Sequence, residues 1–212
     1  MKALVEICCD GIAAARRAVW RGAERIELCH DLSCGGITPA YTEIYGALSL
    51  GRPVNVLVRP RGGNFVYSDA EVEKMSREIA CCGEIGLNGV VLGALTPEGA
   101  VDMDVCRDLI ALARSYELSV TFHRAIDEAA DIFSALAQVL ELGVDRVLTS
   151  GGASGAFEGR GVIAEMVRRA CGRCIVMPGR GVTAENAEAL VECTGASEIH
   201  GSRTELLELP WA

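Results

Sequence analysis

Hydrophobic positions recur along this chain as short apolar runs separated by longer segments of helical periodicity. One short phrase, a glycine followed by three residues and then an apolar run, begins at Gly22, Gly86, Gly143 and Gly195. Each glycine stands where a left-handed residue can end a helix, and the apolar run after it predicts a strand. Further apolar runs at residues 3–9, 54–60, 119–125 and 174–179 complete a set of eight predicted strands.

Helical periodicity fills most of the gaps between these runs. Apolar residues recur at intervals of three and four from Val72 to Ile85 and from Ile132 to Leu140, which predicts amphipathic helices. Residues 90–95 are continuously apolar, as expected of a parallel strand covered on both faces. The alternation predicts an α/β fold, a single-domain (β/α)8 TIM barrel over residues 1–212. A doubly wound open sheet is the alternative, but no Gly-x-Gly-x-x-Gly follows the first strand.

The predicted barrel is minimal at its C-terminal side. The eighth strand is expected at residues 198–200, and residues 204–211 suffice for little more than a turn or two of helix. We therefore expect the final helix to be short or missing. That side of the barrel would then be open or covered by a partner subunit.

Composition narrows the class of protein. The formal net charge is −9 and aromatic residues make up 5% of the chain, so no nucleic-acid partner is expected, since such partners call for a basic surface. No uncharged apolar segment is long enough to cross a membrane. Glu6 and Asp10 interrupt the apolar segment that a signal peptide needs. The ten cysteines are therefore expected to be reduced thiols of a cytoplasmic protein.

Alternation along the strands predicts which side chains point into the barrel. Glu6 and Cys8 on the first strand, and Glu27 and Cys29 on the second, lie opposite apolar faces, so these four are expected inside. The same alternation adds Asn55, Leu57, Arg59, Arg61, Thr121, His123, Glu198 and His200. Active sites of this fold lie at the C-terminal ends of the strands, and unpaired buried charges are costly. A functional site is therefore predicted, with a purely structural Glu–Arg network as the alternative.

These side chains fit chemistry on a small anionic molecule. The candidate catalytic residues are Glu6, Glu27, His123 and His200, because carboxyl and imidazole groups exchange protons. Arg59 and Arg61 are expected to clamp a carboxylate or phosphate. The loops after the seventh and eighth strands often bind phosphate in this fold, which makes Gly179 and Gly181 candidate anion-binding residues. No nucleophile motif is present, so the pattern leaves the reaction type open.

The remaining cysteines are expected to serve packing. Cys171 and Cys174 form a lone C-x-x-C between a helix and a strand, without the four ligands of a structural zinc site. Cys9 is expected to face the helices, whereas Cys34, in the loop after the second strand, is expected near the mouth.

Together these phrases resemble the CutC family, long called copper homeostasis proteins. The most distinctive stretches are Arg-Pro-Arg-Gly-Gly at residues 59–63 and Thr-Phe-His-Arg-Ala at residues 121–125. Other matching stretches lie at residues 6–9, 22–29, 35–39, 146–151, 179–182 and 198–200. The resemblance therefore extends from the first strand to the eighth.

The resemblance implies a cytoplasmic, homo-oligomeric TIM barrel that acts in copper homeostasis. By position, Cys8 and Cys29 correspond to the copper-binding cysteines proposed for the family, and Cu(I) is soft enough to prefer thiolate ligands. The residues themselves leave two functions open: Cu(I) binding through these two thiols, and a TIM-barrel enzyme acting on a small phosphorylated or carboxylated metabolite. A divalent metal held by Glu and His could assist the second function. A scaffold that has lost its chemistry is a third possibility.

Overall fold

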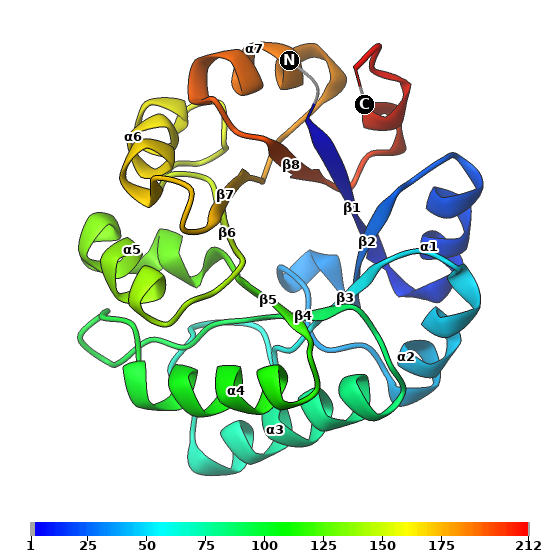
Figure 1. Cartoon of the computed structure of the whole chain (residues 1–212), viewed down its shortest axis with the longest axis vertical. Helices are drawn as coiled ribbons and strands as arrows, with labels where there is room; N and C mark the ends of the chain where they lie inside the picture. Colours follow the sequence, from blue (N-terminus) through cyan, green and yellow to red (C-terminus); the bar gives the residue numbers. More distant parts are fainter. Residues whose placement is uncertain (1–2, 212) are drawn as a thin grey trace.

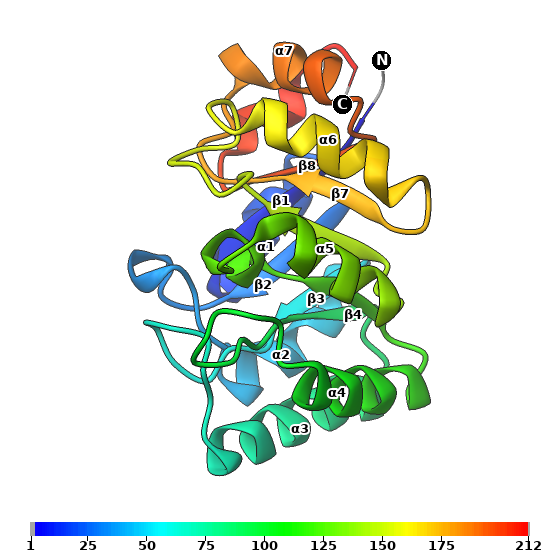
Figure 2. The ribbon, with the colours of Figure 1, turned by 90° about the vertical axis from the view of Figure 1, so that its left-hand side faces the viewer.

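The computed structural model describes residues 3–211 and confirms the predicted TIM barrel (Figure 1). The strands are β1 (Leu4–Asp10), β2 (Arg25–Cys29), β3 (Val54–Leu57), β4 (Gly89–Leu92), β5 (Ser119–Phe122), β6 (Arg146–Thr149), β7 (Ile175–Pro178) and β8 (Glu198–Gly201). The helices are α1 (Gly11–Trp20), α2 (Tyr41–Ala47), α3 (Asp69–Glu84), α4 (Met103–Ser115), α5 (Ile132–Glu141), α6 (Arg160–Ala170) and α7 (Ala184–Thr194). The helices form an outer layer around the strands, as the view from the side also shows (Figure 2).

The sheet is parallel and nearly closed. Its hydrogen-bonded order runs β7-β6-β5-β4-β3-β2-β1-β8. Strand β1 therefore lies between β2 and β8, as a barrel requires. A doubly wound open sheet, the alternative, does not place the first strand beside the last. Strands β7 and β8 also pack side by side, although no ladder joins them in the part of the chain that the structure describes. The first and last strands therefore present their side chains to a common interior.

The repeated glycines end the helices as the sequence predicts. Gly22, Gly86, Gly143 and Gly195 have φ of 102°, 75°, 70° and 70°, which is the left-handed region that favours glycine. A Cβ atom at any of these four positions would meet nothing within 4 Å. The backbone conformation, and not a lack of space, therefore requires glycine there.

Several strands are shorter than the apolar runs predicted. Strand β3 ends at Leu57 and β5 at Phe122, because the chain then turns into the loops around the mouth. After β5 a 3-10 helix, Arg124–Glu128, begins at once. Helix α3 begins where Ser68 and Glu71 form a reciprocal capping box, which satisfies two of the free N–H groups at the helix start.

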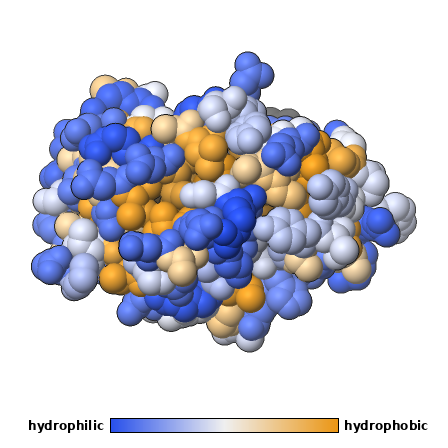
Figure 3. Space-filling view, turned by 90° about the horizontal axis from the view of Figure 1, so that it is seen from below, coloured by the Kyte–Doolittle hydropathy of each residue, from blue (hydrophilic) through white to orange (hydrophobic). Residues whose placement is uncertain are grey.

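The C-terminal side of the barrel is thin. Among the described residues only a short 3-10 helix, Thr204–Glu208, follows β8, which confirms the prediction of a short or missing final helix. This segment packs against α7 and β1. Among residues 3–211 no helix is both long and apolar enough to cross a bilayer. The face of the molecule seen in Figure 3 mixes hydrophobic and hydrophilic side chains.

Candidate active and metal site

Strand alternation places the predicted side chains inside the barrel. Cys8 and Cys29 pack with Leu57 and Val91 in a small apolar cluster of their own. Cys9, by contrast, belongs to the main core beneath the helices, as predicted. Glu6 and Glu27 are buried as well. The first two strands thus direct two carboxyl groups and two thiols towards one central space.

Glu6 is the most strongly held acid of the site. Its side chain is fully buried, and it accepts hydrogen bonds from Arg25 Nε at 2.7 Å and Asn55 Nδ2 at 2.8 Å, while His200 Nδ1 lies 3.0 Å from its other oxygen. Burial opposes ionisation of Glu6, but His200, Arg25 and Asn55 together lower its pKa to about 2. Glu6 is therefore ionised at neutral pH and holds His200 in place; its contacts favour positioning over proton exchange.

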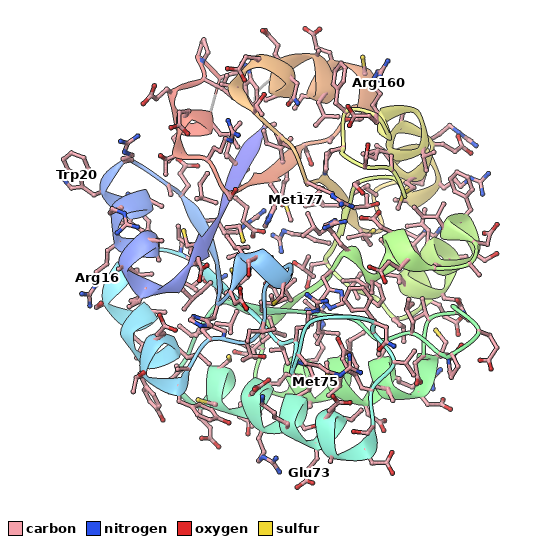
Figure 4. The ribbon with its side chains drawn as sticks, turned by 180° about the vertical axis from the view of Figure 1, so that it is seen from behind. Arg16, Trp20, Glu73, Met75, Arg160 and Met177 are labelled. Atoms are coloured by element: carbon pink, nitrogen blue, oxygen red, sulfur yellow. The ribbon has the colours of Figure 1, made fainter. Side chains whose placement is uncertain are left out.

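A floor of charged residues lies beneath this layer, and sequence reasoning missed part of it. Arg25 is buried and also donates to Glu198, which accepts a second bond from Arg146 Nε at 2.8 Å. Arg25 Nη2 further contacts the sulfur of Met177 at 3.5 Å; Figure 4 places Met177 in the centre of the barrel. Two arginines and two glutamates thus compensate one another at the floor.

The residues of this layer, of which Arg25 and Arg146 were missed and Glu198 was predicted, share one position of the repeat. Arg25, Gly89, Arg146 and Glu198 each stand three residues after a repeat glycine and lie on alternate strands, which is how the interior of a TIM barrel is filled layer by layer. A Cβ atom at Gly89 would lie 2.2 Å from Ser119 Oγ, so glycine is needed where the layer is already full. The position three residues after each repeat glycine was therefore the sequence signal that could have identified this layer.

Above the floor, a thiol, a carboxyl and an imidazole meet. One ligand atom from each of Cys8, Glu27 and His200 lies within 4.8 Å of the others. The Cys8 thiol lies 3.3 Å from Glu27 Oε1, to which it donates, and its sulfur is 3.6 Å from that of Cys29. Cys29 in turn donates to the carbonyl of Cys9 at 3.4 Å. The residues proposed for copper and those proposed for catalysis are therefore parts of one cluster.

Protonation in this cluster is set by burial and by neighbouring charges. Burial raises the pKa of Glu27, the charge of His200 opposes this shift, and Glu6 adds to it. The pKa of the Cys8 thiol lies well above its usual range because of its hydrogen bond with Cys29, its burial and the charge of Glu27. For His200, burial lowers the pKa, but Glu27 and Glu6 outweigh it and raise the pKa overall. Glu27 Oε2 has no hydrogen-bond partner among the described residues.

This cluster forms the base of a cavity of about 560 Å³, a size typical of small-molecule sites. The lining includes Cys8, Glu27 and His200 at the base, the buried Arg59 and His123 on the wall, and Cys34, Arg124, Glu128, Arg180, Gly181, Ser202 and Arg203 nearer the mouth. Arg59, His123, His200 and Gly181 thus meet as predicted, and Cys34 reaches the mouth.

Arg59 and His123 are fixed on the wall by backbone contacts. Arg59 donates to the carbonyls of Cys34, Gly36 and Gly63 at 3.2, 2.9 and 2.8 Å. His123 Nδ1 accepts the N–H of Ala125 at 3.2 Å. Burial, followed by the charge of Arg59, lowers the pKa of His123 to about 3, so its ring is neutral at physiological pH.

Two predicted anion-binding residues do not reach the cavity. Arg61 donates to Glu71 at 2.6 Å and to the carbonyl of Val66 at 2.7 Å and does not line the cavity. The strand alternation that placed it inside stops when β3 ends at Leu57. Gly179 is also absent from the lining. A Cβ atom there would lie 2.4 Å from Leu148 Cδ1, so this glycine provides space inside the barrel.

Comparison with known proteins identifies the family. The model of the CutC family matches residues 3–205. A CutC protein of Xylella fastidiosa strain 9a5c is 50% identical over 203 residues, covering 93% of this chain and 74% of the relative. The human protein named copper homeostasis protein cutC homolog is 45% identical over 200 residues, covering 94% and 72%. A crystal structure of a CutC protein from Streptococcus agalactiae superposes with a TM-score of 0.88 at 33% identity, covering 96% of this chain and 100% of that one. The chain belongs to the CutC family.

Proposed function

We propose that this copper homeostasis protein binds one Cu(I) ion through Cys8 and Cys29, with Glu27 and His200 beside them. The distance of 3.6 Å between the two sulfurs is the observation that carries the proposal. Soft thiolate ligands select Cu(I), and the imidazole and carboxyl of the same cluster lie within 4.8 Å of Cys8. The relative from human carries copper homeostasis in its name.

Binding through these thiols requires that both protons leave. Cys8 is protonated in the metal-free protein because its pKa is raised, and a metal binds the thiolate form. The affinity for Cu(I) should therefore rise with pH.

Such thiols also need a reducing compartment, and we place the protein in the cytoplasm. The exposed Trp20, which projects from the end of α1 (Figure 4), together with Tyr45 and Leu48, fits a surface covered in a homo-oligomer.

X-ray absorption spectroscopy of the Cu(I)-loaded chain tests this function. We expect one copper per chain with two sulfur neighbours and at least one nitrogen or oxygen neighbour. Loading is done anaerobically in the presence of a competing Cu(I) chelator, so that weakly held copper is removed. A spectrum without sulfur neighbours, or a chain that retains no copper against the chelator, would contradict the proposal.

A second candidate function is proton transfer on a small anionic molecule, and the contrast between two carboxyl groups favours it. The pKa of Glu6 is lowered to about 2, whereas that of Glu27 is raised. Environments that push the pKa values of neighbouring acids apart are typical of acid–base catalysis. Glu27 also keeps one oxygen without a partner at the base of the cavity. In this function Glu27 exchanges the proton, His200 assists, and Glu6 orients His200.

The variant Glu27→Gln tests whether the carboxyl is kept for chemistry or for structure. We expect it to raise the free energy of unfolding by about 1–3 kcal/mol at neutral pH, because a buried carboxylate without full hydrogen bonding is costly. The pKa of Glu27 is raised in the folded protein, so the wild type loses stability as pH rises above about 4.5. The stability gained by Glu27→Gln over the wild type should therefore shrink below that pH. Urea unfolding of both proteins at pH 4 and pH 7 measures this difference. A less stable variant would show a structural carboxylate and remove the ground for this second function.

A further inference from the structure

The charge around the cavity is opposite to that of the whole chain. The formal net charge is −9, yet four arginines line the cavity: Arg59, Arg124, Arg180 and Arg203. Only Arg124 contacts a carboxylate among the described residues, Asp127 at 3.0 Å. The carboxyl groups of the lining are Glu27 at the base and Glu128 at the mouth. The mouth is therefore a local excess of positive charge on an acidic protein.

The buried wall of the cavity contains a cation without a counter-ion. Arg59 is 6% exposed, and among residues 3–211 no carboxylate oxygen lies within salt-bridge distance of it. Three carbonyl oxygens accept hydrogen bonds from its two Nη groups, but its Nε has no partner among the described residues, and the positive charge stays uncompensated. Because buried charges in proteins are normally paired, an anion in the cavity would supply what the chain itself does not.

His123 adds a hydrogen-bond donor that has no acceptor. Its Nδ1 accepts a backbone N–H, so in the neutral ring the proton resides on Nε2. His123 is 4% exposed, and Nε2 has no partner among the described residues. The His123 ring lies 4.8 Å from the Phe65 ring between centroids, tilted by 50°, and Arg59 Cζ lies 4.8 Å from the Phe65 centroid. Arg59 and His123 both line the cavity, so the wall contains a buried donor that the described residues leave without an acceptor.

The loops after β7 and β8 supply a second group of donors to the same cavity. Arg180 and Gly181 lie in the first loop, Ser202 and Arg203 in the second. In the described part of the chain the backbone N–H groups of Gly181, Ser202 and Arg203 donate to no carbonyl. Arg180 has φ of 80°, a conformation that costs energy for a residue other than glycine and is found preferentially at functional sites. Two loops with free N–H groups and guanidinium groups match the several oxygens of a phosphate.

We propose that the cavity binds a small phosphate monoester that carries a second oxygen group. The phosphate lies between the loops after β7 and β8, held by Arg180, Gly181, Ser202 and Arg203. The second group, a carboxylate or carbonyl oxygen, meets Arg59 and the Nε2–H of His123. The atoms between these two ends then lie over Glu27. The inference deepens the second function proposed above by naming the substrate class, and it does not depend on Cu(I) binding.

Calorimetric titration of the metal-free chain with three probes tests the proposal. The probes are phosphoglycolate, inorganic phosphate and glycolate, at constant ionic strength. We expect phosphoglycolate to bind at least about tenfold more tightly than either fragment, because charge-assisted hydrogen bonds at both ends contribute together. No measurable binding of phosphoglycolate, or equal binding of phosphoglycolate and glycolate, would overturn the proposal.

Two variants with matched charge locate the site. Arg180→Gln/Arg203→Gln changes two exposed side chains and should weaken phosphoglycolate and phosphate at least about tenfold while leaving glycolate unchanged. Arg107→Gln/Arg168→Gln removes the same charge from α4 and α6 and should leave all three affinities unchanged. Equal losses in both variants would mean that general charge attracts the probe, and the proposal would be wrong.

The variant Glu27→Gln separates this proposal from the function on which it rests. It leaves the phosphate loops intact and should retain phosphoglycolate binding within about threefold. If binding persists while Glu27→Gln proves less stable than the wild type, the phosphate site stands and proton transfer by Glu27 falls. If the variant is more stable but phosphoglycolate does not bind, the phosphate site falls and the acid–base function stands.

Discussion

Serine in place of both Cys8 and Cys29 should weaken Cu(I) binding by more than about 100-fold. Loss of groups that merely support metal ligands costs about 10–100-fold, and here the two soft donors themselves are lost, leaving hydroxyl groups that Cu(I) disfavours. The fold should tolerate the change, because a hydroxyl is smaller than a thiol and can still donate to Glu27 Oε1, as Cys8 does. Anaerobic competition against a colorimetric Cu(I) chelator measures the affinity.

The double variant Cys171→Ser/Cys174→Ser is the matched control. It also removes two thiols, but from the segment before β7: Cys171 is exposed and Cys174 packs in the main core. Its affinity for Cu(I) should equal that of the wild type. Because copper binds to most accessible thiol pairs, equal losses in both double variants, or none in the Cys8→Ser/Cys29→Ser variant, would refute the assignment of the site.

Copper binding and proton transfer compete for the same atoms. Glu27 Oε1 accepts a hydrogen bond from the Cys8 thiol, and Cys8, Glu27 and His200 form one candidate ligand cluster. A Cu(I) ion on Cys8 and Cys29 would replace the thiol proton through which Cys8 donates to Glu27 Oε1, and the ion would occupy the base of the cavity beside Glu27. An enzyme that uses a protonated Glu27 would therefore be inhibited by Cu(I), so the two functions exclude each other at any one moment in a single chain.

The sequence predicted the barrel because its signals were local and repeated. Glycines such as Gly86 and Gly143 end helices through backbone conformation alone, and the apolar runs that follow alternate faces regularly. The same alternation placed Glu6, Cys8 and Glu27 inside correctly, since strands β1 and β2 are long enough for parity to hold. Within regular strands, the periodicity of two therefore suffices to predict the interior.

Beyond the strand ends the prediction failed for a physical reason. Arg61 follows β3 in a loop, where its direction depends on Glu71 of helix α3, a contact that strand alternation does not describe. Arg25 was missed although it lies in strand β2. A charged residue three positions after a repeat glycine is typical of a turn, and this pattern hid the start of the strand. Its partners Glu6 and Glu198 lie on β1 and β8, so only closure of the barrel brings them together.

Replacement of Arg25 by methionine should lower the free energy of unfolding by about 3–5 kcal/mol at pH 7, because it leaves buried carboxylates without their common partner. Arg25 joins Glu6 to Glu198. The effect should depend on pH. The pKa of Glu6 is about 2 in the folded protein, below its usual value of 4.5, so its contribution to stability is present above about pH 4.5 and is lost as the pH falls towards 2. The difference between wild type and variant should narrow over that range.

Urea unfolding of both proteins at intervals between pH 2.5 and pH 7 measures this dependence. Arg77→Met is the matched control, since it breaks an exposed ion pair with Glu73 on α3 and should cost no more than about 1 kcal/mol. If Arg25→Met costs no more than this control, the floor network contributes little to stability. A loss that stays constant down to pH 2.5 would instead mean that the packing of the Arg25 side chain against Met177, and not its charge, supports the floor of the site.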